Sequence, residues 1–160
     1  MDWHAQLAVV TTTGYAMVLG GVIGFEREMK NRPAGFRTHM LVAGAASLLL
    51  GIGLLVLADP TIPQLMRVQI DPLRLMEAVV AGVSFIGAGS IFAARRHDTV
   101  AGVTTAASLL MVAVIGAAAG LHYHWLALAA TVLTLLVLNT LNALERRLLH
   151  KNELPSRDRR

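Results

Sequence analysis

The nineteen residues Met40–Ala58, MLVAGAASLLLGIGLLVLA, contain no Asp, Glu, Lys or Arg. A helix of that length rises about 28 Å, which is close to the thickness of the hydrocarbon core of a bilayer. The apolar residues follow one another in runs and do not alternate with polar ones, as they would in a barrel strand. The stretch therefore predicts a membrane-spanning helix.

Similar stretches, equally free of those four residue types, lie on both sides of it. The chain has 160 residues, 55% of them hydrophobic and 15% charged, and its mean hydropathy is +0.59. Such a composition leaves too little polar surface to cover a soluble globule. The sequence thus predicts an all-α, polytopic membrane protein with five transmembrane helices, at Leu7–Phe25, Met40–Ala58, Ala78–Ala94, Val100–Leu121 and Tyr123–Leu144.

The 14 Lys and Arg residues are distributed unevenly between the loops of this arrangement. Only Arg67 and Arg74 fall on one side of the five spans, and the other twelve fall on the opposite side. Cytoplasmic loops carry such an excess, so the N-terminus is expected outside and the C-terminus in the cytoplasm. Residues 1–144 would form one five-helix domain and residues 145–160 a charged cytoplasmic tail. Because topology accounts for the net charge of +4, we expect contact with the lipid bilayer and no nucleic-acid binding.

A short internal similarity links the two halves of the chain. Ala34–Thr38 reads AGFRT and Ala101–Thr105 reads AGVTT, and an Ile-Gly pair precedes each, at 23–24 and 86–87. If the similarity is significant, helices one and two and helices three and four form a parallel repeat, with both loops on the cytoplasmic side. Coincidence in a chain rich in Gly and Ala is the alternative.

Five short blocks occur in order along the chain: GFERE at 24–28, RPAGFRT at 32–38, DPLR at 71–74, FIGAG at 85–89 and GVTTAA at 102–107. They resemble the signature blocks of the MgtC/SapB family of membrane proteins, although Phe36 and Val103 stand where leucine is usual. The resemblance implies a protein of the bacterial inner membrane, associated with magnesium limitation and, in some members, with virulence and control of the ATP synthase. It also implies the short form of the family, without the soluble C-terminal domain of longer members.

Four charged residues are expected together at the cytoplasmic face. Glu26 and Arg27 end the first helix, Arg37 begins the second and Asp98 precedes the fourth. A bidentate pair between Arg37 and Glu26 would hold the hairpins together. The alternative is that all four are solvated loop charges that only fix the topology.

Three threonines lie near the same face. Thr104 and Thr105 would cap the fourth helix by accepting hydrogen bonds from its first amides. Alternatively, their hydroxyls line a cytoplasmic pocket opposite Arg37 and Thr38.

A second polar group is expected on the outer side. Asp71 followed by Pro72 predicts the start of the third helix, with Asp as its N-cap and Pro at its first position. Glu77 lies about 8 Å further in, where a carboxylate is costly without a partner. Asp71, Arg74 and Glu77 are therefore a candidate ion site, unless Arg74 simply pairs with Glu77.

Glycines within the predicted spans suggest close helix packing. Small residues at a four-residue spacing let two helix backbones approach one another. In the third helix, glycines could instead interrupt the helix and expose carbonyl groups to an ion. The glycines concerned are Gly20, Gly24, Gly82, Gly87, Gly89, Gly116 and Gly120.

The sequence predicts no enzyme, since no nucleophile stands beside a base and no phosphate-loop or zinc spacing occurs. We expect a regulatory protein that supports growth under magnesium limitation or stress by contacting another membrane complex, such as the ATP synthase, or a second copy in a homodimer. The alternative is a small oligomeric transporter of Mg2+ or protons, with its path at Asp71, Glu77 and the glycine-rich third helix. No cofactor is predicted, and Mg2+ stays open as a ligand.

Overall fold

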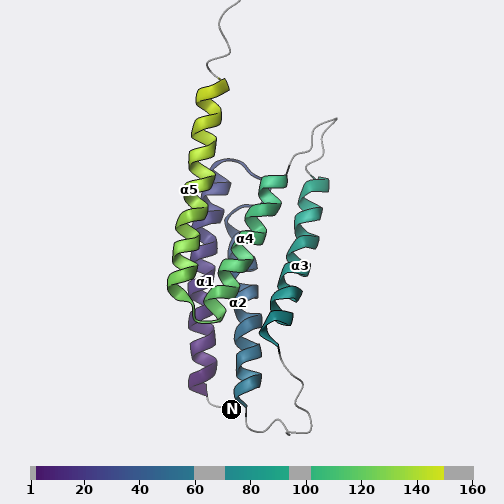
Figure 1. Ribbon diagram of the computed structural model, residues 1–160, viewed down its shortest axis with the longest axis vertical. Helices are drawn as coiled ribbons and strands as arrows, with labels where there is room; N and C mark the ends of the chain where they lie inside the picture. Colours follow the sequence, from purple (N-terminus) through teal and green to yellow (C-terminus); the bar gives the residue numbers. More distant parts are fainter. Residues whose placement is uncertain (1–2, 60–70, 94–101, 150–160) are drawn as a thin grey trace, which may run out of the picture.

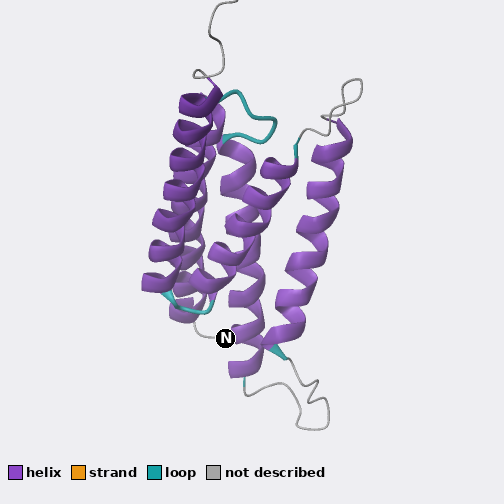
Figure 2. Cartoon of the chain, turned by 45° about the horizontal axis from the view of Figure 1, so that its top comes forward, coloured by secondary structure: helices purple, strands orange, loops and turns teal. Residues whose placement is uncertain are grey.

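The computed structural model describes residues 3–59, 71–93 and 102–149. Every regular element in these residues is a helix (Figures 1 and 2). The first four helices are long and apolar enough to cross a membrane. The predicted class, an all-α polytopic membrane protein, is therefore confirmed. The five helices are α1 (Trp3–Met29), α2 (Phe36–Ala58), α3 (Pro72–Ala93), α4 (Val103–Gly120) and α5 (His124–Leu149).

The start of α3 follows the sequence prediction closely. Asp71 precedes the helix, and its Oδ1 accepts a hydrogen bond of 2.9 Å from the amide of Leu73. Pro72 occupies the first helical position, where the amide hydrogen that proline lacks would have no partner in the helix. The Asp-Pro cap is confirmed, and the Asp71 carboxylate is occupied in making it.

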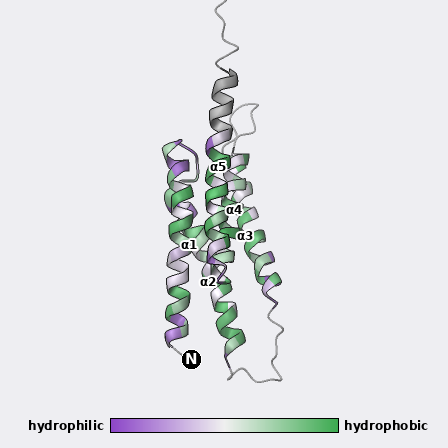
Figure 3. Ribbon diagram, turned by 60° about the vertical axis from the view of Figure 1, so that its left-hand side comes forward, coloured by the Kyte–Doolittle hydropathy of each residue, from purple (hydrophilic) through white to green (hydrophobic). Residues whose placement is uncertain are grey.

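The core of the bundle lies between α1, α2 and α4, and α3 stands at the edge (Figure 1). Ile23, Ala43 and Val112 are completely buried there, one from each of the three central helices. In α3, by contrast, only Val79, Val83 and Gly87 are buried. Figure 3 shows hydrophobic residues along most of the length of the helices, and many large ones are exposed, among them Leu41, Phe85 and Leu133, which suits contact with lipid.

Four of the predicted packing glycines lie at tight helix contacts. A Cβ added to Gly20 would lie 2.6 Å from the carbonyl oxygen of His39, and one on Gly24 would lie 2.8 Å from the Cα of Phe36. On α4, a Cβ at Gly116 or Gly120 would collide with the backbone of α2. Glycine at these positions lets α1 and α4 approach α2 from two sides.

The glycines of α3 behave differently. A Cβ on Gly87 would lie 3.2 Å from that of Ala106 on α4, but Cβ atoms on Gly82 and Gly89 would meet nothing within 4 Å. The packing prediction thus fails for Gly82 and Gly89 within the described part of the chain. Since α3 is one continuous helix, its glycines do not interrupt it.

One glycine contact recurs in both hairpins. Gly24 lies against His39 in the first hairpin, and Gly87 lies against Ala106 in the second. When residues 34–38 are aligned with 101–105, His39 falls on Ala106. The shared contact supports the predicted repeat, which stays a prediction.

The last helix, α5, is attached to α1 by polar contacts at two levels. The Tyr15 hydroxyl donates to the carbonyl oxygen of His124 over 3.0 Å, and Lys30 donates to the Asn139 side chain over 3.0 Å. The two contacts are separated by 15 residues on both helices. The paired residues follow one another in the same order and at the same spacing on both helices. The helices α1 and α5 therefore run side by side in the same direction.

Candidate functional site

The buried face of α1 ends in a charged residue. Ala16, Gly20, Ile23 and Arg27 follow one another at helical spacing, so Arg27 continues the stripe that packs into the core. Only 1% of the Arg27 side chain is exposed. The backbone turns at this residue, because the amide of Arg32 donates to the Arg27 carbonyl oxygen over 3.0 Å. The guanidinium is therefore buried close to the end of α1.

A neighbouring carboxylate accompanies this cation. Glu26 Oε2 lies 3.9 Å from Nη1 of Arg27, and Glu26 Oε1 forms an ion pair with Lys30, one turn further along α1. The Glu26 side chain is 11% exposed, so both charges of the Glu26–Arg27 pair are largely removed from water. Removing one partner of such a pair costs far more than the pair contributes, because the other charge remains buried.

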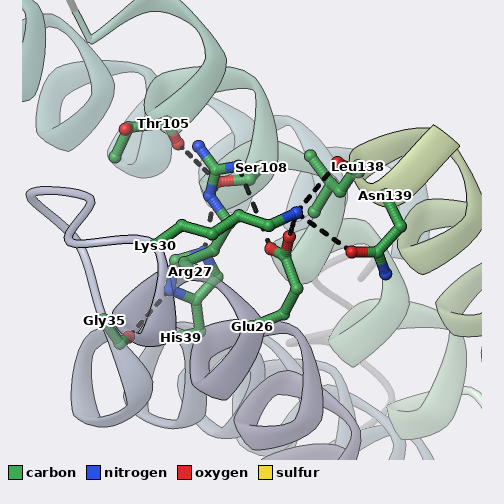
Figure 4. Close-up of polar contacts among 9 residues, drawn as sticks. All are labelled: Glu26, Arg27, Lys30, Gly35, His39, Thr105, Ser108, Leu138 and Asn139. Atoms are coloured by element: carbon green, nitrogen blue, oxygen red, sulfur yellow. Dashed lines mark hydrogen bonds and ion pairs between the residues drawn. The ribbon is translucent and has the colours of Figure 1, made fainter. Parts of the chain in front are cut away.

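Lys30 extends this cluster to α5. Its Nζ donates to the carbonyl oxygen of Leu138 over 3.2 Å as well as to Oδ1 of Asn139, and Figure 4 shows it reaching across from α1. One ammonium group therefore neutralises Glu26 and holds α5 against α1. We call Glu26, Arg27 and Lys30 the ionic cluster.

A neutral network lies beside the ionic cluster and joins α2 to α4. His39 is completely buried, with Nδ1 2.9 Å from the carbonyl oxygen of Gly35 and Nε2 3.1 Å from the Ser108 hydroxyl. Ser108 also lies 2.8 Å from the carbonyl oxygen of Thr105 (Figure 4). Because a carbonyl only accepts, Nδ1 carries a proton. In the neutral ring, Nε2 then competes with the Thr105 carbonyl for the single hydroxyl proton of Ser108.

Glu28 caps α2 from the preceding helix. Its Oε2 accepts a hydrogen bond of 2.8 Å from the amide of Phe36, the first residue of α2. A carboxylate at this end also interacts favourably with the helix dipole. A Cβ on Gly35 would lie 2.8 Å from the same oxygen, so a larger residue there would displace the Glu28 side chain from this cap.

The predicted bridge between Glu26 and Arg37 is not formed. Arg37 is exposed, and it takes part in neither ion pair of the described residues. His39, two residues later, faces the core, and residues two apart on a helix point in different directions. The bridging roles belong to Arg27 and Lys30 instead.

The three threonines and Asp98, which were predicted at the same cytoplasmic face, do not form one group in the described residues. Thr105 is buried and Thr104 exposed, but neither caps α4, because Gly102 with φ 91° begins the helix without a side-chain cap. Thr38 is partly buried and lines a pocket between α2 and α3. Asp98 lies outside the described residues.

Among the described residues, no hydrogen bond between side chains and no ion pair joins the three members of the predicted outer ion site, which stays a prediction. Asp71 is engaged by the backbone, while Arg74 and Glu77 are both exposed and form no ion pair with each other. Within the described ranges no three His, Asp or Glu residues are placed to hold a metal ion.

Sequence reasoning missed Glu28, Lys30, His39 and Ser108. The spacing of Lys30 from Glu26, four residues on a helix, is a known ion-pair signal. His39 and Ser108 gave no such signal, because their partners come from another helix 69 residues away.

A family model described as the MgtC family matches residues 14–147. Among curated proteins, "Putative magnesium transporter YhiD" of Escherichia coli (strain K12) is 39% identical over 137 residues, which are 86% of this chain and 62% of that protein. "Protein SapB" of Bacillus subtilis (strain 168) is 33% identical over 136 residues, 85% of this chain and 57% of that protein.

"Protein MgtC" of Brucella abortus (strain 2308) is 36% identical over 139 residues, 86% of this chain and 52% of that protein. The chain thus spans little more than half the length of these relatives. No solved structure matches the chain.

Proposed function

The chain belongs to the MgtC family, and on that premise we propose that it is a non-enzymatic protein of the bacterial inner membrane that supports adaptation to magnesium limitation by binding another membrane protein. The observation that carries the proposal is the position of Glu77. It lies on an exposed face of α3, about 8 Å from the start of that apolar helix.

A carboxylate on a lipid-facing surface is costly unless it finds a partner. Glu77 has no ion pair among the described residues, and a partner protein with a cation or a hydrogen-bond donor would supply one. Phe85 and Phe92, 83% and 72% exposed, fall within about a quarter turn of Glu77 around α3. We call Glu77, Phe85 and Phe92 the α3 contact face.

The ionic cluster favours this proposal over ion transport. Two cations, Arg27 and Lys30, surround the single carboxylate of Glu26, and like charges in a poorly solvated site repel Mg2+. The cluster is suited to holding α1 and α5 together, so that α3 is presented on a firm scaffold.

Transport of Mg2+ is the second candidate. The name of the Escherichia coli relative, at 39% identity, favours it. In that case a second copy of the chain would have to complete the path for the ion.

The experiment is growth at limiting Mg2+ of a strain that lacks its own copy of the gene. We expect full rescue by the wild type and by Leu126→Ala, which removes a large exposed side chain from α5. Glu77→Gln and Phe85→Ala should each reduce the growth yield at least about five-fold, at equal abundance in the membrane. Full rescue by both variants would show that the α3 contact face is not used.

A further inference from the structure

A groove runs along α3, formed by two adjoining pockets that share Ile86. One pocket lies between α2 and α3, and the other is also lined by Pro33 and Ala34 before α2 and by Leu109 of α4. The pocket of about 390 Å3 has only apolar walls, with Leu41, Leu49 and Val83 among them. The pocket of about 370 Å3 adds the hydroxyl-bearing residues Thr38 and Ser90. The groove is therefore apolar over most of its length and polar at one end.

Glycines create this groove. Gly82 lines the apolar pocket and Gly89 the polar one, and a Cβ at either position would meet nothing within 4 Å. They are seven residues apart, so they lie on the same side of α3. Around α3, this side lies about a third of a circle from Glu77 but less than a quarter of a circle from Phe85 and Phe92.

An unpaired cation lies at the polar end. Arg37 directly precedes Thr38, which lines the polar pocket, and lies one turn before Leu41, which lines the apolar pocket. It is exposed and in neither ion pair of the described residues. The distribution of Lys and Arg puts this end at the cytoplasmic surface, where basic sites between helices bind anionic headgroups.

The chemistry of the lining indicates the occupant. The walls of one pocket are apolar, hydroxyl groups line the other, and the exposed Arg37 directly precedes Thr38 at that end. An anionic phospholipid has the same order, with a charged headgroup at one end and apolar acyl chains beyond it.

We propose that the groove binds an anionic phospholipid, with an acyl chain along Leu41, Leu49 and Gly82 and the phosphate beside Arg37 and Thr38. This role differs from the one proposed for the α3 contact face, which is adjacent to the groove on α3. It also gives Arg37, Gly82 and Gly89 a common purpose, since none of them contributes to the ionic cluster or to helix packing.

The test is native mass spectrometry of the purified protein with phosphatidylglycerol or phosphatidylethanolamine of identical acyl chains. We expect one bound lipid per chain and a preference for phosphatidylglycerol of about five-fold, the effect of one cation near a headgroup. Arg37→Gln should abolish the preference. Arg32→Gln, which removes another exposed arginine from the same end, should retain it.

A second pair of variants tests the groove itself. In the double variant Gly82→Leu with Gly89→Leu, the new side chains enter open space, so the protein should still fold. The amount of either lipid bound to this variant should be at least about five-fold lower than the amount bound to the wild type. Gly14→Leu is the matched control, because a Cβ there also meets nothing within 4 Å but lies on α1.

Three results would overturn the proposal. The first is that the double variant and Gly14→Leu retain equal amounts of lipid, and the second is that Arg37→Gln keeps the preference for phosphatidylglycerol. The third is that the wild type forms a dimer without lipid and the double variant does not. The last would assign the groove to a second copy of the chain.

Discussion

Arg27 and Glu26 show how strongly a single buried charge depends on its neighbour. Arg27 is almost fully enclosed, and within the described residues its Nε and Nη2 have no hydrogen-bond partner. Among the described residues, the ion pair that compensates its charge is the one with Glu26, at 3.9 Å. A guanidinium without that carboxylate would be left uncompensated in the core.

We expect Glu26→Gln to lower the free energy of unfolding by about 3 kcal/mol, the usual cost of removing one partner of a buried pair. Arg27→Met should cost clearly less, because Glu26 keeps Lys30. The measurement is thermal unfolding in detergent followed by circular dichroism. Equal destabilisation by the two variants would contradict the assignment of Glu26 as the compensating charge.

His39 and Ser108 form the polar join between α2 and α4. Ser108→Ala leaves Nε2 of a completely buried ring without a partner, which costs about 1 to 3 kcal/mol. Ser90→Ala is the control, since within the described residues the Ser90 hydroxyl bonds to the carbonyl oxygen of Gly87 on its own helix and to no other helix. If chemical unfolding finds the two variants equally stable, the His39 network does not hold the helices together.

At the scale of the helices, the fit between α4 and α2 depends on backbone contact. A methyl group on Gly116 would run into the carbonyl of Ala43, which cannot move without shifting α2. On α3 the same change at Gly82 meets open space. The two glycines look alike in sequence and differ only in what the fold places opposite them.

Gly116→Ala should therefore destabilise the bundle, at a cost of about 2 kcal/mol or more from overpacking. Gly82→Ala should be neutral or stabilise the helix by up to about 1 kcal/mol, because alanine has the higher helix propensity. Melting temperatures of the two purified variants give the comparison. A stable Gly116→Ala protein would show that α4 does not press against α2 as described.

The elements themselves were largely predictable, and the pairing between them was not. Apolar runs between charges gave the helices, and Asp71-Pro72 gave the start of α3, because both signals are local in the chain. Arg37 was assigned to Glu26 because both fall at one face, yet the rotation of α2 turns His39 inward. Lys30 and Asn139 are 109 residues apart, and no local pattern links them.

For the whole molecule, the orientation in the membrane stays a prediction from charge. The chain has no cysteine, so single cysteines can be introduced without background. An impermeant maleimide should label His4→Cys from outside intact spheroplasts, and should label Arg37→Cys only after lysis. The reverse pattern would place the ionic cluster, Arg37 and the proposed headgroup site on the outer face.

The central claim is that this MgtC-family protein acts through contact with another membrane protein and does not conduct ions. The most direct measurement is flux into liposomes that contain folded, monodisperse protein, with Mg2+ and pH followed separately. We predict no flux above that of protein-free liposomes, for the wild type and for Glu77→Gln alike. Saturable Mg2+ or proton flux that Glu77→Gln abolishes would contradict the account and make the protein a transporter.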